Sequence, residues 1–338
     1  MPDELQLEAL LSEPTEALIE AMARLEGDVV ILGVAGKMGP SLARLALRAS
    51  RTAGIERRVI GVARFSDSAV RESLERDGIS TIAVDLFDPQ ALAALPEVRN
   101  VVYMVGQKFG TTADAARTWA VNAFLPGLVA ERYARSRIVA FSTGNVYPFS
   151  DATSEGPDEG TALDPVGEYA QSAVARERVL EYFSRRNRTP MSILRLNYAI
   201  EPRYGVLRDL ADTVWAGDTV DVSMGFVNVI WQRDANAIAL RAFAHCESPP
   251  FVLNLTGRPA QSVRWIAEEL GRRLGKSPLI LGVESHQALL SNAAGCESLF
   301  GLAPVGIDEM LDRVAAWVAE GGRSLARPTH FTERSGRF

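Results

Sequence analysis

Lysine is nearly absent from this chain of 338 residues, although basic residues are not. Of 36 basic residues only Lys37, Lys108 and Lys276 are lysine, and all the others are arginine. A codon supply biased towards arginine accounts for the general imbalance. Against that background a lysine inside a loop that follows an apolar strand is informative, and Lys37 and Lys108 both occupy such loops.

Several other features are scarce, and each absence excludes a class of protein. Two cysteines, Cys246 and Cys296, are too few for a disulfide framework or a four-cysteine metal site, and the three histidines lack metal-ligand spacing. No apolar run approaches the length of about 20 residues that spans a bilayer, and the acidic N-terminus does not resemble a secretion signal. A net charge of −6 argues against nucleic acid or a membrane surface as partner. We therefore expect a cytoplasmic protein, without a metal site, that acts on a small molecule.

Apolar strand-like segments alternate with helix-period segments along most of the chain. The predicted strands are 28–32, 59–63, 79–84, 100–105, 137–142, 192–196, 226–230 and 251–255. The predicted helices are 12–26, 40–48, 113–135, 167–186, 206–215, 234–245, 262–274 and 307–319. This alternation predicts an α/β fold of the Rossmann type, in which a doubly wound parallel sheet is covered by helices and carries a smaller C-terminal substrate-binding cap.

The same pattern predicts three interleaved parts. Residues 1–27 form an N-terminal helical extension, in which Ser12 can cap the helix and Pro14 suits its first turn. Residues 28–197 plus 226–256 form the dinucleotide-binding domain. Residues 198–225 plus 257–330 form the cap, which would select the substrate.

A glycine loop joins the first predicted strand to the helix that follows it. Gly33, Gly36 and Gly39 have GxxGxxG spacing. Glycines permit a tight turn and close approach of a ligand to the backbone, and the helix start supplies free N–H groups and partial positive charge. The loop, with Lys37 and Met38 inside it, therefore predicts a site for a dinucleotide pyrophosphate. The alternative is a mere tight connection between strand and helix.

Residues at the ends of the next two strands indicate which dinucleotide would bind and where its adenine would lie. An acidic residue at the end of the second strand would bind the ribose hydroxyls of NAD, but Ala63 stands there and Arg64 follows it. Arg64 could instead hold the 2′-phosphate of NADP, so we favour NADP over NAD. Asp85 and Leu86 follow the third strand, where a carboxylate can meet the adenine amine; the alternative for Asp85 is a turn residue.

Two hydroxyl groups are expected on the reacting side of the site. Thr143 directly follows the predicted fifth strand, at whose carboxyl end side chains point into the crevice that binds ligands in such sheets. Tyr169 lies early on the following helix, and a phenol can exchange a proton with an alcohol–carbonyl pair if its pKa is lowered from about 10.

Taken in order, these residues resemble the extended short-chain dehydrogenase/reductase family, in its NAD-dependent epimerase/dehydratase group. The resemblance covers about residues 28–275 and includes the glycine loop, Asp85, the segment Ser142–Tyr147, the Tyr169 helix and Arg195-Leu196-Asn197. It implies that Thr143 hydrogen-bonds the substrate oxygen, that Tyr169 is the acid or base, and that Asn122 lies on a supporting helix near the active site.

The chain departs from this family at one position that carries chemistry. The family's Tyr-x-x-x-Lys motif places a lysine beside the tyrosine, because residues i and i+4 share a helix face, and Ala173 stands there instead. Lys108 follows the fourth strand on a loop expected to border the nicotinamide, so it is the candidate substitute cation. An exposed loop lysine is the alternative for Lys108, and Lys37 either meets cofactor phosphate or is solvated. Arg176 is expected to have a surface or packing role.

Two functions remain open. The first is an NAD(P)-dependent oxidoreductase or epimerase that acts on a sugar-like or polyol alcohol. The second is a non-catalytic dinucleotide-binding protein that serves redox sensing or partner binding. The hydroxyl pair Thr143 and Tyr169 favours the enzyme, because a sensor does not need it. Gly144-Asn145 after Thr143 counts against a sugar-nucleotide dehydratase, in which the resemblance implies an Asp-Glu pair. The helices at 113–135 and 167–186 are expected to form a homodimer.

Overall fold

A computed structural model describes residues 3–337. Its centre is a seven-stranded sheet in the order β12-β7-β5-β4-β1-β2-β3, in which every pair of neighbours is parallel. The strands are β1 Val29–Leu32, β2 Val59–Ala63, β3 Ser80–Ala83, β4 Asn100–Tyr103, β5 Arg137–Thr143, β7 Met191–Leu196 and β12 Phe251–Leu255. The chain starts at β1 in the middle, builds outward to β3, and returns to build the other half from β4. The predicted doubly wound Rossmann-type sheet is confirmed.

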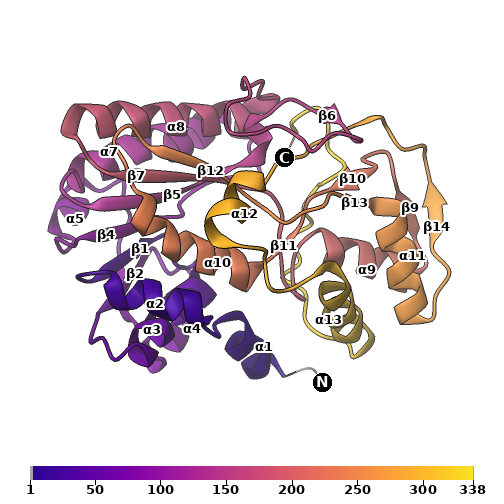
Figure 1. Ribbon diagram of the computed structural model, residues 1–338, viewed down its shortest axis with the longest axis horizontal. Helices are drawn as coiled ribbons and strands as arrows, with labels where there is room; N and C mark the ends of the chain where they lie inside the picture. The colour runs from indigo at the N-terminus through magenta and orange to yellow at the C-terminus, as the bar shows by residue number, and fades with distance from the viewer. Residues whose placement is uncertain (1–2, 338) are drawn as a thin grey trace.

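Helices cover both faces of this sheet because its strands are apolar on both sides. Along β1, Val29 and Ile31 pack into one core cluster and Val30 and Leu32 into another, as the two-residue period of a strand requires. The first cluster lies under α2, α3 and α10, and the second under α7 and α8, which occupy opposite sides of the sheet (Figure 1). These helices are α2 Glu16–Arg24, α3 Gly39–Thr52, α7 Leu125–Arg132, α8 Gly167–Asn187 and α10 Gln232–Arg241.

A second apolar core gathers short elements beside the carboxyl ends of the strands (Figure 1). It is built on α9, α11 and α13, joined by Leu7 and Leu11 from the N-terminal helix α1 and by Phe331 from the C-terminal segment. Its elements are α1 Glu4–Leu11, β8 Ala199–Ile200, α9 Val206–Ala216, β9 Thr219–Asp221, β10 Phe226–Val227, β11 Ile230–Trp231, β13 Gln261–Ser262, α11 Val263–Leu274, β14 Leu279–Leu281 and α13 Ile307–Ala319. The boundaries of the three predicted parts stay a prediction.

Several predicted elements differ in detail. The helix predicted over 12–26 corresponds to α2 alone, which begins at Glu16 with the Thr15 side chain as its cap. Ser12, the predicted cap, instead ends α1, a helix that lies before the predicted one. The strand predicted over 226–230 is divided between β10 and β11, which pair with different partners. Several elements were not predicted. In the second core these are α1, β8, β9, β13 and β14, and elsewhere they are α4 Ser68–Arg76, α5 Pro89–Ala94, α12 Ala294–Phe300, β6 Ser150–Asp151 and β15 Gln287–Ala288.

The helix predicted over 113–135 contains a change of helix type. It begins as α6 Ala115–Trp119, continues as a π-helical turn at Ala120–Phe124, and ends as α7. Such wide turns usually occur at functional sites, and this one contains the buried Asn122.

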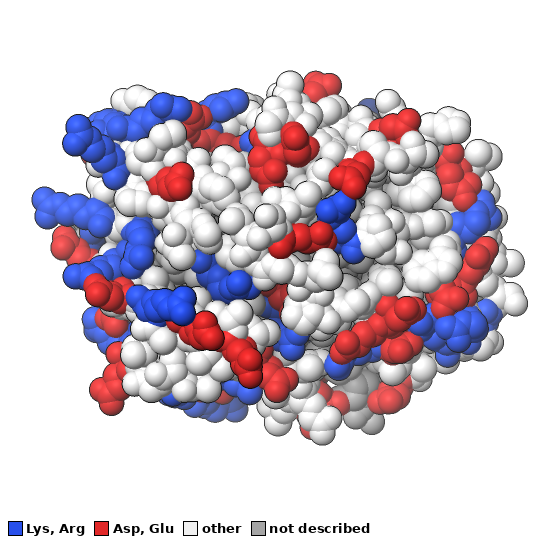
Figure 2. Space-filling view, in the orientation of Figure 1, with Lys and Arg blue, Asp and Glu red and all other residues white. Residues whose placement is uncertain are grey.

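The space-filling view shows basic and acidic side chains interspersed over this face of the molecule (Figure 2). A stripe of basic residues, which is typical of nucleic-acid binding, is not seen on the face drawn. No helix among residues 3–337 is long and apolar enough to cross a membrane.

A buried ion pair joins α8 to the sheet. Arg195 of β7 donates from Nη2 to Oε2 of Glu177 at 2.7 Å, and the hydroxyl of Ser142 on β5 donates to Oε1 of Glu177 at 2.5 Å. Arg195 also donates to the hydroxyl of Tyr147 at 2.7 Å. The two charges compensate each other where both side chains are buried.

We therefore expect Arg195→Met to lower the free energy of unfolding by about 3–5 kcal/mol, because it leaves the Glu177 carboxylate buried without its partner. Arg185→Met is the control, since Arg185 pairs with Glu181 on the exposed side of the same helix and an exposed i,i+4 pair contributes only about 0.3–0.5 kcal/mol. Urea unfolding measures both variants. Equal losses in the two variants would contradict this assignment.

Candidate active site

A cavity of about 330 Å³ opens at the carboxyl ends of β1, β4, β5 and β7. This is where the strand order reverses, and doubly wound sheets bind ligands at that point. Eight of the residues predicted from the sequence line this one cavity: Gly33, Gly36, Lys37, Met38, Gly39, Lys108, Thr143 and Tyr169.

The glycine turn has the geometry of a phosphate cradle. Gly33 has a φ of +87°, and a Cβ on Gly39 would stand 2.2 Å from the carbonyl oxygen of Val34, so neither position accepts a side chain without a shift of the backbone. Helix α3 starts at Gly39, and its N-cap residue Met38 makes no side-chain cap hydrogen bond. The first N–H groups of α3 therefore have no side-chain cap and suit an anionic ligand. The turn fits a dinucleotide pyrophosphate.

Three predicted cofactor residues lie outside this cavity, at the ends of β2 and β3. Arg64 is exposed, and no carboxylate of residues 3–337 forms an ion pair with it. Asp85 is exposed and accepts a hydrogen bond from the backbone N–H of Phe87 at 3.0 Å, which is the geometry of a turn residue. Leu86 is buried in the core beneath.

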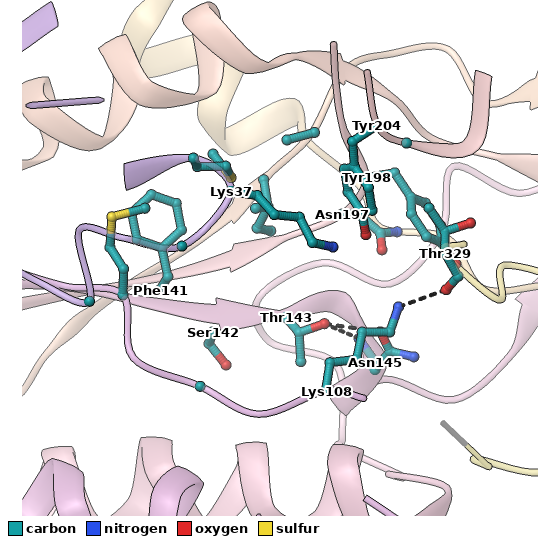
Figure 3. Close-up of a pocket in the computed structure, with 18 of the residues that line it drawn as sticks. Lys37, Lys108, Phe141, Ser142, Thr143, Asn145, Asn197, Tyr198, Tyr204 and Thr329 are labelled. Carbon is teal, nitrogen blue, oxygen red and sulfur yellow. Dashed lines mark hydrogen bonds between the residues drawn. The ribbon is translucent and has the colours of Figure 1, made fainter. Parts of the chain in front are cut away.

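Thr143 and Tyr169 approach the cavity from different elements. Thr143 is the last residue of β5, and its hydroxyl donates to Oδ1 of Asn145 at 3.0 Å while accepting from the Asn145 N–H at 3.2 Å (Figure 3). Tyr169 lies in the first turn of α8. The sheet thus supplies one hydroxyl, and the helix that follows the same strand supplies the other.

The position of the missing lysine is filled by packing. Ala173 is fully buried and contacts Val146 and Tyr147. The nearest lysine ammonium to Tyr169 comes instead from Lys108, whose Nζ is 5.9 Å from the centre of the Tyr169 ring and donates to the Thr329 carbonyl at 3.2 Å (Figure 3). Burial lowers the pKa of Lys108 to about 8, against the attraction of Asp209, which raises it.

Arg176 is a buried member of the site and not a surface residue. Its guanidinium donates to the carbonyl of Phe141 at 2.9 Å and to Oδ1 of Asn122 at 2.7 Å. A Cβ on Gly106 would stand 2.9 Å from Nη2 of Arg176, so the loop after β4 passes directly over this charge. The sequence signal was its place seven residues after Tyr169, two turns along the same helix face.

Asn122 connects Arg176 to the loop that carries Lys108. Its side-chain oxygen accepts from the Gln107 N–H at 2.8 Å, and its side-chain nitrogen donates to the Gln107 carbonyl at 2.9 Å and to the Ser172 hydroxyl at 3.0 Å. The π-helical turn thus fixes the backbone next to Lys108.

Lys37 extends from the glycine turn towards the cap. Its Nζ is 3.3 Å from the centre of the Tyr204 ring and 4.7 Å from that of Phe109 (Figure 3). Burial, together with repulsion from Lys108 and Arg327, lowers the pKa of Lys37 to about 7, against the attraction of Asp209, which raises it.

Residues of the cap and the C-terminal segment complete the cavity, and the sequence analysis missed them. They are Tyr198, Tyr204, Arg327 and Thr329. Thr329 is held by Asp209, whose Oδ2 accepts from its N–H at 2.7 Å and from its hydroxyl at 2.6 Å. Burial raises the pKa of both tyrosines and of Asp209. A contact between residues 120 positions apart leaves no local sequence signal.

Three arginines of the segment 203–233 are engaged in ion pairs within the protein. Arg203 pairs with Glu201 and Glu8, Arg208 with Asp212, and Arg233 with Asp234. Arg203 and Arg208 are buried, so they are neither surface charges nor available to a substrate. No group of three or more potential metal ligands occurs among residues 3–337.

The fold and the glycine cradle define a dinucleotide-binding α/β protein. Residues 29–209, more than half of the chain, match the model of the NAD-dependent epimerase/dehydratase family. The chain therefore belongs to that family, which confirms the resemblance seen in its sequence. Among curated proteins, none matches the sequence significantly.

Solved structures share the fold at low sequence identity. The UDP-glucuronic acid 4-epimerase of Bacillus cereus, in complex with NAD, is 16% identical with a TM-score of 0.73, and the match covers 87% of this chain and 99% of that one. The UDP-glucose 4-epimerase of Thermotoga maritima, with UDP-glucose, is 17% identical with a TM-score of 0.72 and the same coverage. The dTDP-glucose 4,6-dehydratase of Bacillus anthracis, in complex with NAD, is 15% identical with a TM-score of 0.73, covering 87% and 97%.

Proposed function

We propose that this protein is an NAD(P)-dependent oxidoreductase or epimerase acting on an alcohol or carbonyl group of a sugar-like or polyol substrate. The observation that carries the proposal is that Thr143 and Tyr169 line the same cavity as the glycine turn. Membership of the epimerase/dehydratase family supports it. So do the solved neighbours, whose substrates are nucleotide-linked sugars.

In the proposed reaction Thr143, Tyr169 and Lys108 have separate roles. When bound, the nicotinamide ring supplies hydride transfer at the carbon that bears the reacting oxygen. In this proposal the Thr143 hydroxyl hydrogen-bonds that oxygen, and the Tyr169 phenol oxygen takes the proton of an alcohol or returns it to a carbonyl. Lys108 brings positive charge to the side of Tyr169, where charge develops as the proton moves.

A non-catalytic dinucleotide-binding protein is the second candidate, and one observation favours it. Ala173 is sealed against Val146 and Tyr147, so α8 offers no lysine beside Tyr169. Redox sensing or partner binding would need the glycine turn without the proton transfer.

The Tyr169→Phe variant separates the two candidates. We expect it to bind the dinucleotide as the wild type does and to lose activity by about 10²–10⁴-fold in a screen of sugar and polyol substrates, the usual contribution of a general acid or base. Dinucleotide affinity by calorimetry is the matched measurement. A wild-type protein that binds dinucleotide but oxidises or epimerises nothing supports the sensor, and full activity in the variant refutes the role of Tyr169.

We propose that the cofactor is NADP rather than NAD, because the exposed Arg64 follows β2 and could hold the 2′-phosphate. The named neighbours with a cofactor hold NAD, so the preference needs a direct test. In calorimetry, Arg64→Gln should weaken NADP binding by about 10- to 150-fold and leave NAD binding unchanged, since a charge-assisted hydrogen bond to phosphate contributes about 1.5–3 kcal/mol. Arg58→Gln, an exposed arginine paired with Asp28, is the control. Equal binding of both dinucleotides by the wild type would contradict the preference.

We also propose a homodimer through the helices at 115–132 and α8. Trp119, Phe124 and Tyr182 are large apolar side chains exposed on these elements, and exposed apolar groups are typical of an interface. Analytical ultracentrifugation should give twice the chain mass for the wild type and a monomer for Phe124→Asp with Tyr182→Asp. A wild-type monomer would refute the dimer, and Leu281→Asp, at an exposed residue of β14, is the control.

A further inference from the structure

The cavity gathers more positive than negative charge. Lys37, Lys108 and Arg327 come from three separate segments, and repulsion from the other two lowers the pKa of Lys37. The carboxylate that attracts Lys37 is Asp209, one oxygen of which accepts both hydrogen bonds of Thr329. Within residues 3–337, neither Lys37 nor Arg327 forms an ion pair with a carboxylate. Gathering like charges in a half-buried place costs free energy that a bound anion would recover.

The direction in which the Lys37 side chain points indicates whether this anion belongs to the cofactor or to the substrate. Backbone N–H groups of the glycine turn and the start of α3 suit the cofactor pyrophosphate. The Lys37 side chain leaves the turn for the Tyr204 ring of the cap, and its ammonium lies between the turn and the Lys108–Thr329 contact (Figure 3). That place is on the side of the cavity formed by Tyr204 and the Lys108 loop, and Lys108 is the lysine near Tyr169.

The C-terminal segment 321–337 forms a packed wall of this part of the cavity. The Leu325 N–H donates to the Arg203 carbonyl at 3.0 Å, and Thr329 is held by Asp209. Further along, Gly336 lies so close to Gly167, at the start of α8, that a Cβ on Gly167 would meet the Gly336 carbonyl oxygen at 2.4 Å. The segment therefore spans from the cap to the helix of Tyr169.

The cavity bounded in this way is small. Its volume of about 330 Å³ includes the space along the glycine turn and lies near the lower end of the range of about 300–1,000 Å³ for ligand pockets. Aromatic rings of Phe109, Tyr169, Tyr198 and Tyr204 line it, and rings of this kind pack against the carbon skeleton of a sugar. The space suits a compact substrate more than one that carries a nucleotide.

We propose that Lys37, Lys108 and Arg327 form a subsite for a carboxylate or phosphate group of the substrate, which is a sugar acid or sugar phosphate without a nucleotide. The inference rests on the proposed function for the identity of the reacting group. An oxyanion of the substrate and the pyrophosphate of the cofactor are chemically alike, so the experiment must distinguish these two sources.

Calorimetry with D-glucuronate, 6-phospho-D-gluconate, D-glucose and UDP tests the proposal on the full chain, both with and without saturating NADP or NAD. We expect at least one of the two acids to bind and neutral D-glucose and UDP to bind at least tenfold more weakly. Arg327→Gln should weaken the acid by about tenfold, as expected for loss of a charge-assisted contact, while dinucleotide affinity stays unchanged. Arg327 is exposed, so this variant should fold. Arg323→Gln, on the same segment but paired with Glu4, should change neither affinity.

Four outcomes overturn the proposal. If UDP binds as tightly as the acids, the site is a nucleotide site. If neutral D-glucose binds as tightly as the acids, charge plays no role in substrate binding. A fall in dinucleotide affinity in Arg327→Gln with no fall for the acid would assign the cations to the cofactor. Failure of both acids to bind, in either state of the protein, refutes the subsite. Dinucleotide binding in the same titrations reports on the proposed function separately.

Discussion

The buried pair of Glu177 and Arg195 is the interaction on which the geometry of the site depends. Glu177 lies on α8 two turns beyond Tyr169, Arg195 lies on β7, and Ser142 beside Thr143 donates to the same carboxylate. One carboxylate therefore ties together the strand that presents the threonine and the helix that presents the tyrosine. Through the Tyr147 hydroxyl, which donates to Asn254 at 2.8 Å, the network reaches β12 at the edge of the sheet. A charged pair so deep in the protein adds little net stability, but either partner alone would be costly, so the register of these elements is strongly specified.

A second network supports the opposite wall. Arg176, one residue before Glu177, faces the ends of β4 and β5 and holds Asn122, which in turn holds both backbone groups of Gln107. Adjacent residues on α8 thus point to different partners: Glu177 organises the strands on the Thr143 side, and Arg176 organises the loop that carries Lys108. The π-helical turn at 120–124 is what brings the Asn122 side chain to this loop. The reacting half of the cavity is in this way supported from a single helix.

Local patterns were sufficient to predict the parallel sheet, the glycine turn and eight cavity residues, of which all but Tyr169 end a strand or lie in the loop after one. They were sufficient because a strand fixes where its carboxyl end lies, and parallel strands bring these ends to one edge. They failed where the site is made by contacts between distant segments. Thr329 and Asp209 meet only through the packing of the second core, and nothing in the sequence near Arg327 distinguishes it from the many other arginines. The sequence predicts only a surface or packing role for Arg176. Its place seven residues after Tyr169 on the same helix does not reveal that the loop after β4 covers its side chain.

The replacement of the motif lysine by Ala173 changes more than one side chain. In a Tyr-x-x-x-Lys helix the cation is fixed to the same rigid element as the tyrosine. Here the lysine near Tyr169 comes from the Lys108 loop. Lys37 of the glycine turn and Arg327 of the C-terminal segment add positive charge to the same cavity, and each of these segments is positioned by a different set of contacts. Because Lys108 donates to the Thr329 carbonyl and Thr329 is held by Asp209 of the cap, the charge beside the phenol depends on the cap and the C-terminal segment being in place. The contacts that bound this part of the cavity are therefore also the contacts that position its charge, whereas a lysine on the tyrosine's own helix would be independent of them.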